Sequence, residues 1–285
     1  MPAQKSTILV TGANGQLGQE IIHIEDDDVV LVGLDRLQLD VTDLEMCRKA
    51  VKTYQPSAII HAGAYTAVDK AEAEPDEAYK VNALGTRNLA IAAREASAKL
   101  CYVSTDYVFD GSGNRPYNEY DDTNPQSVYG KSKRAGEVLL QSLCDRWFIV
   151  RTSWVYGKYG NNFVKTMLKL AQDRNELTVV HDQKGSPTYT RDLGRFLVDL
   201  VKTETFGIYH ASNAGTCSWY EFAKAIFEES GKEIKLTPCT TDEFPRPAPR
   251  PLYSVMDHAA IRQNGFQDLP SWRESLRTFL KELQG

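Results

Sequence analysis

Short apolar runs alternate with helical stretches along the first half of this 285-residue chain. This alternation limits the available folds more than any other feature, because strands separated by single helices need crossover connections and pair in parallel. The strands are expected at residues 7–10, 29–34, 58–61, 99–103 and 148–151, and the helices at 16–24, 44–54, 76–96 and 128–143. The pattern predicts an α/β fold with a doubly wound, Rossmann-type parallel sheet.

The alternation loosens after about residue 154, which indicates a second, smaller domain. Helical spacing returns at residues 161–171, 191–201 and 219–229, with a turn-rich stretch at 184–188 between them. Residues 244–251 alternate proline with other residues, so this segment is either a linker or a stiff loop. We expect residues 1–153 to form a dinucleotide-binding domain and 154–285 to form mainly a substrate domain, with part of 186–211 returning to the first.

Charge and cysteine content exclude several classes of protein. The formal charge of −5 argues against a broad nucleic-acid surface. The five cysteines are scattered and form no Cys-x-x-Cys pair, which favours reduced thiols in the cytoplasm, and the five histidines lack metal-ligand spacing. We therefore expect a cytoplasmic protein that binds no nucleic acid and has no metal site formed by these cysteines and histidines. No apolar run reaches the length of a membrane span, so we expect no membrane association.

A glycine-rich turn joins the first expected strand to the first expected helix. Glycines at such a turn let backbone N–H groups approach a pyrophosphate, and the helix dipole adds attraction for anions. An acidic residue, Asp35, stands at the end of the second strand, as it does in dinucleotide-binding sheets. A glycine turn without a ligand is the alternative interpretation. The residues expected to hold the cofactor here are Gly12, Asn14, Gly15, Gln16, Leu17 and Gly18.

The residues after the second strand leave the choice of cofactor open. Asp35 would accept a hydrogen bond from the adenosine ribose and favour NADH, whereas Arg36 would meet a 2′-phosphate and favour NADPH. Asp40 and Val41 are expected at the adenine. Small residues close the third strand, as a surface against which a cofactor lies would need, although helix packing would also explain them. They are Ala62, Gly63 and Ala64, and we count Tyr65 and Val103 with them as cofactor-binding residues.

Tyr129 and Lys133 are four residues apart on an expected helix and therefore share one face. A phenol has a reference pKa of about 10. A nearby ammonium favours the phenolate and would lower that pKa, which makes the pair a proton-transfer device for neutral pH. A solvated helix face is the alternative. The proton-transfer interpretation is favoured because a glycine-rich turn and the strand-end sequence Ser104-Thr105-Asp106 precede the pair.

These motifs together resemble the extended short-chain dehydrogenases and, more narrowly, the dTDP-4-dehydrorhamnose reductase family. The dehydrogenase motifs are residues 11–18, Asn82-Ala83, 104–111 and the Tyr129-x-x-x-Lys133 pair. The narrower resemblance rests on residues 64–72, 151–157, 160–163, 182–188 and 218–222, and it runs nearly end to end. It implies reduction of the C4 ketone of a dTDP-linked deoxysugar by NADPH or NADH.

The resemblance also implies a role for individual residues. Tyr129 would protonate the forming alkoxide, Lys133 would hold the nicotinamide ribose and lower the Tyr129 pKa, and Thr105 would hydrogen-bond the carbonyl and the phenol. The sugar or diphosphate would contact Asp106, Trp154, Asn161, Asn162, Phe163 and Arg191, with Arg246 and Arg250 as further candidates. Some relatives are magnesium-linked homodimers, and neither the magnesium ligands nor the dimer can be placed on this sequence.

Two other functions remain open at this point. Another nucleotide-sugar reductase or epimerase of the same class would share every catalytic residue and differ in its pocket. A non-catalytic subunit that resembles the methionine adenosyltransferase beta subunits would act by binding a partner. The complete set of Thr105, Tyr129 and Lys133 argues against the second, because a binding module needs no proton-transfer pair.

Overall fold

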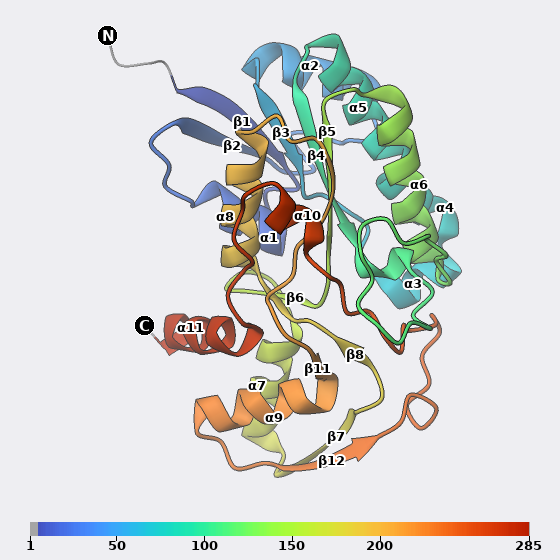
Figure 1. The fold of residues 1–285 in the computed structure, drawn as a ribbon, viewed down its shortest axis with the longest axis vertical. Helices are drawn as coiled ribbons and strands as arrows, with labels where there is room; N and C mark the ends of the chain where they lie inside the picture. The colour runs from blue at the N-terminus through green and yellow to red at the C-terminus, as the bar shows by residue number, and fades with distance from the viewer. Residues whose placement is uncertain (1–4, 285) are drawn as a thin grey trace.

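The computed structural model describes residues 5–284, and a six-stranded parallel sheet forms its centre (Figure 1). The strand order is β10-β5-β4-β3-β1-β2, with every neighbouring pair parallel, which confirms the predicted sheet. The chain leaves β1 for β2 on one side and then for β3 on the other, so the switch point lies between β1 and β3. The strands are β1 (Ser6–Thr11), β2 (Val29–Leu34), β3 (Ala58–His61), β4 (Lys99–Thr105), β5 (Trp147–Thr152) and β10 (Gly207–His210).

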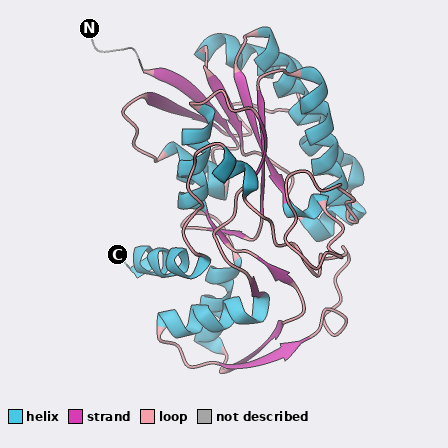
Figure 2. Cartoon of the chain, in the orientation of Figure 1, coloured by secondary structure: helices cyan, strands magenta, loops and turns pink. Residues whose placement is uncertain are grey.

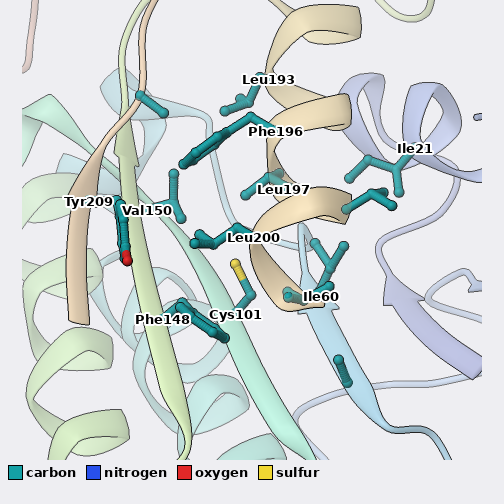
Figure 3. Close-up of a cluster of buried hydrophobic side chains, with 14 of the residues drawn as sticks. Ile21, Ile60, Cys101, Phe148, Val150, Leu193, Phe196, Leu197, Leu200 and Tyr209 are labelled. Carbon is teal, nitrogen blue, oxygen red and sulfur yellow. The ribbon is translucent and has the colours of Figure 1, made fainter. Parts of the chain in front are cut away.

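Helices cover both faces of this sheet (Figure 2). Helices α1 (Gln16–Ile22) and α8 (Thr190–Val201) pack on one face, where Leu193, Leu197 and Leu200 meet strand residues such as Val150 (Figure 3). Helices α2 (Leu44–Tyr54), α5 (Thr86–Glu95) and α6 (Val128–Leu143) pack on the other. Strand side chains alternate between the two cores, as Ile8 and Val10 do against Leu9. Both α8 and β10 come from the second half of the chain and lie in the sheet layers.

The helix expected at residues 76–96 is not continuous. Helix α3 (Val68–Ala73) and helix α4 (Pro75–Tyr79) lead into a wider π-helical turn, η1 (Lys80–Gly85), before α5 begins. Within η1, the Asn82 side chain accepts from the Tyr65 N–H at 2.8 Å and donates to the Ser132 hydroxyl at 2.9 Å. Helical periodicity cannot reveal such an insertion, because the apolar spacing on either side is unchanged.

A group of short strands and three longer helices lies at the bottom of Figure 1, and we call this group the second domain. Its core gathers aromatic and aliphatic side chains, including Tyr156, Phe222 and Phe279. Its strands are β6 (Val155–Tyr156), β7 (Glu176–Val180), β8 (Lys184–Gly185), β9 (Thr188–Tyr189), β11 (Cys217–Ser218) and β12 (Lys235–Cys239). Its helices are α7 (Phe163–Asp173), α9 (Trp219–Ser230) and α11 (Trp272–Gln284), and the short α10 (Ala259–Gln263) lies beside β10.

The proline-rich segment at residues 244–251 forms neither helix nor strand, and its arginines tie it to the first domain. Arg250 donates through Nη2 to Asp69 Oδ1 at 2.9 Å, and Arg246 approaches the other oxygen of that carboxylate at 3.8 Å. It is therefore a stiff loop that is held in place, and not a free linker. Among residues 5–284, no helix combines the length and apolarity needed to cross a bilayer.

Candidate active site

A cleft of about 670 Å³ opens at the carboxyl ends of the sheet strands, beside the second domain. Parallel sheets bind ligands at this edge, next to the switch point between β1 and β3. Most residues predicted from the sequence line it: Gly12, Asn14, Gly15, Gln16, Leu17, Arg36, Asp40, Val41, Ala62, Gly63, Ala64, Tyr65, Val103, Thr105, Asp106, Tyr129, Lys133, Trp154 and Asn161. The remaining five, which are Gly18, Asp35, Asn162, Phe163 and Arg191, lie outside this lining.

The glycine-rich turn is shaped so that only glycine fits at two of its positions. Gly12 has φ +70°, and a Cβ on it would lie 2.5 Å from the Cα of Gly63. A Cβ on Gly18 would lie 2.2 Å from the Gly12 carbonyl oxygen, so Gly18 serves helix packing and does not face the cleft. Gly15 precedes α1 without a side-chain cap, which leaves the first helical N–H groups available to an anion. These features fit a dinucleotide pyrophosphate.

Asp35, the expected ribose ligand, is held by its own turn. Its Oδ1 accepts from the Leu37 and Gln38 N–H groups at 2.9 and 3.0 Å, and its Oδ2 accepts from Asn14 Nδ2 at 2.7 Å. Arg36 lines the cleft beside it, and its charge contributes to lowering the pKa of Asp40. A guanidinium at the adenosine end suits a phosphate better than a bare ribose hydroxyl.

Tyr129 and Lys133 come from the first turns of α6. Ser127 caps this helix by accepting from the Gly130 N–H at 3.1 Å. Lys133 is buried, donates from Nζ to the Val103 carbonyl at 2.7 Å, and lies 4.0 Å from the centre of the Tyr102 ring. Burial lowers the Lys133 pKa to about 7, partly offset by the Glu137 carboxylate. The predicted pair therefore reaches the cleft, with its ammonium anchored to the end of β4.

The Tyr129 pKa moves against the expectation from the sequence. Burial raises it to about 12, a hydrogen bond with Thr105 lowers it in part, and the Asp106 carboxylate raises it further. The predicted lowering by Lys133 is wrong for this structure, because Lys133 is itself held in a buried position that favours its neutral form. A high pKa keeps the phenol protonated at neutral pH, which is the form that a reduction needs.

Thr105 and Asp106 follow directly at the end of β4, at the start of the short 3-10 turn η2 (Asp106–Val108). The Thr105 hydroxyl donates to Asp106 Oδ1 at 3.0 Å and accepts from the Tyr107 N–H at 3.2 Å. Asp106 is 2% exposed, and its Oδ2 has no partner among the described residues. Burial raises the Asp106 pKa to about 6, although hydrogen bonds from Ser254 and Thr105 lower it in part.

A buried ion pair that we did not predict joins α6 to β5 next to this site. Glu137 accepts from Arg151 Nε at 3.0 Å and from its Nη2 at 2.9 Å, and it also accepts from the Ser104 hydroxyl at 2.6 Å. Arg151 in turn lies 3.4 Å from the Nε2 of buried His210. Glu137 is four residues after Lys133, so the same helical spacing places it on the inward face of α6. This four-residue spacing from Lys133 was the feature of the sequence from which a buried role of Glu137 could have been predicted.

The expected substrate residues divide into two groups. Trp154, at φ +48°, stacks on Trp219 with 3.6 Å between ring centres and lines the cleft, as Asn161 does. Asn162 instead caps α7 through the Lys165 N–H and donates to Gln16 Oε1 at 2.9 Å. Phe163 packs its ring against Trp219 inside the second domain. Capping and core packing thus engage Asn162 and Phe163, and their contact with the sugar stays a prediction.

Arg191 is exposed at the start of α8 and lies outside the lining of the cleft, so its contact with substrate stays a prediction. Burial raises the pKa of Glu20, the charges of Arg191 and Lys158 lower it in part, and the charge of Glu282 raises it further. Across residues 5–284 no group of three or more acidic, histidine or cysteine side chains could hold a metal.

Comparison with known proteins gives a consistent result. The sequence profile described as RmlD substrate binding domain matches residues 6–285. The chain is 45% identical to the spore coat polysaccharide biosynthesis protein SpsK of Bacillus subtilis over 96% of this chain and 97% of the relative. It is 42% identical to a dTDP-4-dehydrorhamnose reductase of Aggregatibacter actinomycetemcomitans, over 95% and 97% of the two chains. A crystal structure of dTDP-4-dehydrorhamnose reductase from Bacillus anthracis, in complex with NADP, superposes with a TM-score of 0.96 at 46% identity, covering 98% of this chain and all of the other.

Proposed function

Since the chain belongs to the RmlD substrate-binding-domain family, we propose that it reduces the C4 ketone of dTDP-4-dehydro-L-rhamnose to give dTDP-L-rhamnose. The observation that carries this proposal is the meeting of Thr105, Tyr129 and Lys133 in one cleft with the glycine-rich turn. The same cleft holds a site for a dinucleotide and a proton donor for the alcohol product. The protein is thus an NAD(P)H-dependent oxidoreductase of dTDP-rhamnose biosynthesis.

The reaction divides between cofactor and protein. The bound nicotinamide supplies the hydride to the ketone carbon. Tyr129 donates the proton to the developing alkoxide, and its pKa of about 12 keeps that proton in place until the alkoxide forms. Thr105 orients the carbonyl oxygen, and Lys133 holds the nicotinamide ribose. Proton transfer by a positioned side chain contributes about 10²–10⁴-fold to such a rate.

We propose further that NADPH is the preferred cofactor. The oxygens of Asp35 are engaged by Asn14, Leu37 and Gln38, so they are poorly placed to receive a ribose hydroxyl. Arg36 lines the same end of the cleft. A guanidinium forms strong charge-assisted hydrogen bonds with a phosphate group, and NADH lacks the 2′-phosphate that would receive them. The relative from Bacillus anthracis was crystallised with NADP.

The sugar would lie between the catalytic residues and the second domain. Trp154 offers an apolar ring face, which suits the 6-deoxy end of the sugar, and Asn161 offers an amide at the same wall. Asp106 is buried beside Thr105 and faces the carbonyl position. These side chains are the determinants that would separate this substrate from those of other nucleotide-sugar enzymes.

The location and assembly of the enzyme are also proposals. All five cysteines are buried free thiols, which agrees with action in the reducing cytoplasm. A homodimer is a further proposal, which rests on the family resemblance. Light scattering of the purified protein tests the dimer, and a mass near that of one 32.0 kDa chain would exclude it.

The direct test is a coupled assay. Purified protein is mixed with enzymatically generated dTDP-4-dehydro-L-rhamnose and either NADPH or NADH, and loss of nicotinamide absorbance is followed. Chromatography must identify dTDP-L-rhamnose as the product, with a faster rate for NADPH. Demonstrated cofactor binding without turnover would favour a different nucleotide sugar or a regulatory subunit. A panel of other dTDP-linked ketosugars and a partner pull-down separate those two outcomes.

A further inference from the structure

We propose that Asp106 is a positioning residue whose protonation decides whether Thr105 can donate its hydroxyl proton to the substrate carbonyl. This inference rests on the proposed ketone reduction, in which Thr105 orients the carbonyl oxygen. It assigns to Asp106 a control of the chemical step, beyond the sugar contact expected from the sequence.

The geometry around the Thr105 hydroxyl carries the argument. A threonine hydroxyl has one proton to give. Here Thr105 gives it to Asp106 Oδ1 at 3.0 Å, while its oxygen accepts from the Tyr107 N–H at 3.2 Å. While Asp106 is a carboxylate, this proton is committed to it, because a bond to an ionised acceptor is roughly twice as strong as one to a neutral carbonyl.

Protonation of Asp106 reverses the direction of this bond. The carboxyl O–H can then donate to the Thr105 oxygen, and the Thr105 proton becomes free to point into the cleft. Thr105 and Tyr129 would both donate to the carbonyl oxygen in this state, which stabilises the negative charge that develops there. In the ionised state only Tyr129 can donate, and the nearby carboxylate opposes that charge.

The surroundings of Asp106 place its titration near working pH. The group is 2% exposed and Oδ2 has no partner among residues 5–284, so burial disfavours the charged form. The polar groups facing it are Ser254 from the C-terminal segment, Thr105 and Tyr107 from its own segment, and Tyr129 from α6. Arg250, whose charge acts on the adjacent Tyr107, is paired with Asp69, and Lys133 lines the same cleft. The resulting Asp106 pKa of about 6 means that both forms exist around neutrality.

The test is the pH dependence of the single-turnover rate of NADPH oxidation, with substrate saturating, between about pH 5 and about pH 8.5. A protonation with a pKa of about 6 predicts that the wild-type rate falls by up to roughly 50-fold from pH 6 to pH 8, and by less where Tyr129 alone sustains a rate in the ionised form. In Asp106→Asn, an amide N–H can donate permanently to Thr105. This variant is expected to lose the inflection near pH 6, and any change that remains near pH 7 belongs to Lys133.

A second variant does not depend on how the new amide is oriented. The neighbouring Ser254 hydroxyl lowers the pKa of Asp106 in part, and Ser254 does not line the cleft. Ser254→Ala should therefore move the inflection to higher pH. The matched control is Ser142→Ala, at an exposed position late in α6, which should leave the wild-type profile unchanged.

Retention of the wild-type inflection in Asp106→Asn, or an unmoved inflection in Ser254→Ala, would overturn the proposal. A raised KM with an unchanged pH profile in Asp106→Asn would reduce Asp106 to a substrate contact. A wild-type protein without turnover at any pH would instead refute the proposed function itself, so the two failures are distinguishable.

Discussion

Replacing Glu137 with glutamine should destabilise the whole protein, because it leaves a buried charge without its partner. The Arg151 side chain is 2% exposed and that of Glu137 is fully buried. Two hydrogen bonds, at 3.0 and 2.9 Å, join the guanidinium to the carboxylate. Glu137→Gln keeps the shape of the side chain but removes its charge, so Arg151 stays buried with its positive charge uncompensated.

The expected loss follows from this burial. Removing one member of a buried ion pair destabilises a protein by about 3–5 kcal/mol. Folded proteins are stable by roughly 5–15 kcal/mol, so the variant loses a large share of its stability. The double variant Glu137→Gln with Arg151→Met removes both charges and should recover part of that loss, because an apolar side chain tolerates this environment better than an unpaired guanidinium.

Urea unfolding followed by circular dichroism measures these free energies. The matched control is Glu176→Gln in the exposed pair with Lys235, whose side chains are 73% and 75% exposed. Such a pair contributes about 0–1 kcal/mol, so the control should unfold close to the wild type. A loss below about 1 kcal/mol for Glu137→Gln would refute the reasoning. A double variant that is less stable than the single one would contradict the assignment of the loss to an unpaired charge.

Three further results are expected. Gly12→Ala should lower the free energy of unfolding by more than about 2 kcal/mol, because the new Cβ would lie 2.5 Å from the Gly63 Cα and the backbone is left-handed at this position. Gly63→Ala is the matched control in the same urea assay, and it should be tolerated because its nearest contact would be 3.5 Å. Arg36→Ala should weaken NADPH binding about 10- to 100-fold by titration and leave NADH binding unchanged, since a charge-assisted bond contributes about 1.5–3 kcal/mol; equal effects on both cofactors would contradict the phosphate contact. Exhaustive treatment with EDTA should leave the reductase rate unchanged, and a loss restored by Mg²⁺ would show a metal site that the described residues do not form.

The sheet and most of the cleft could be predicted because their signals are local. Each strand is a short apolar run, the glycine turn sits between a strand and a helix, and Tyr129 and Lys133 share a helix face by spacing alone. The α/β fold and the parallel sheet were therefore predictable. The π-helical turn at Lys80–Gly85 was not, because an inserted residue leaves the apolar spacing of the flanking helices intact.

A sequence cannot separate two uses of the same side chain. Asn162 stands at a position that suits either a sugar contact or a helix cap, and the structure shows the cap. Arg191 looks like a phosphate ligand by type, yet it lies outside the lining of the cleft. The Tyr129 pKa was predicted in the wrong direction because a sequence shows which charges are near in the chain but not which groups are buried.

The central claim is that Tyr129 donates the proton that completes ketone reduction, and its most direct test is kcat for Tyr129→Phe. The substitution removes one oxygen and leaves the ring, so NADPH binding should remain. We predict that kcat falls about 10²–10⁴-fold while KM for the nucleotide sugar changes little. A variant that keeps most of its kcat with dTDP-4-dehydro-L-rhamnose would contradict the account.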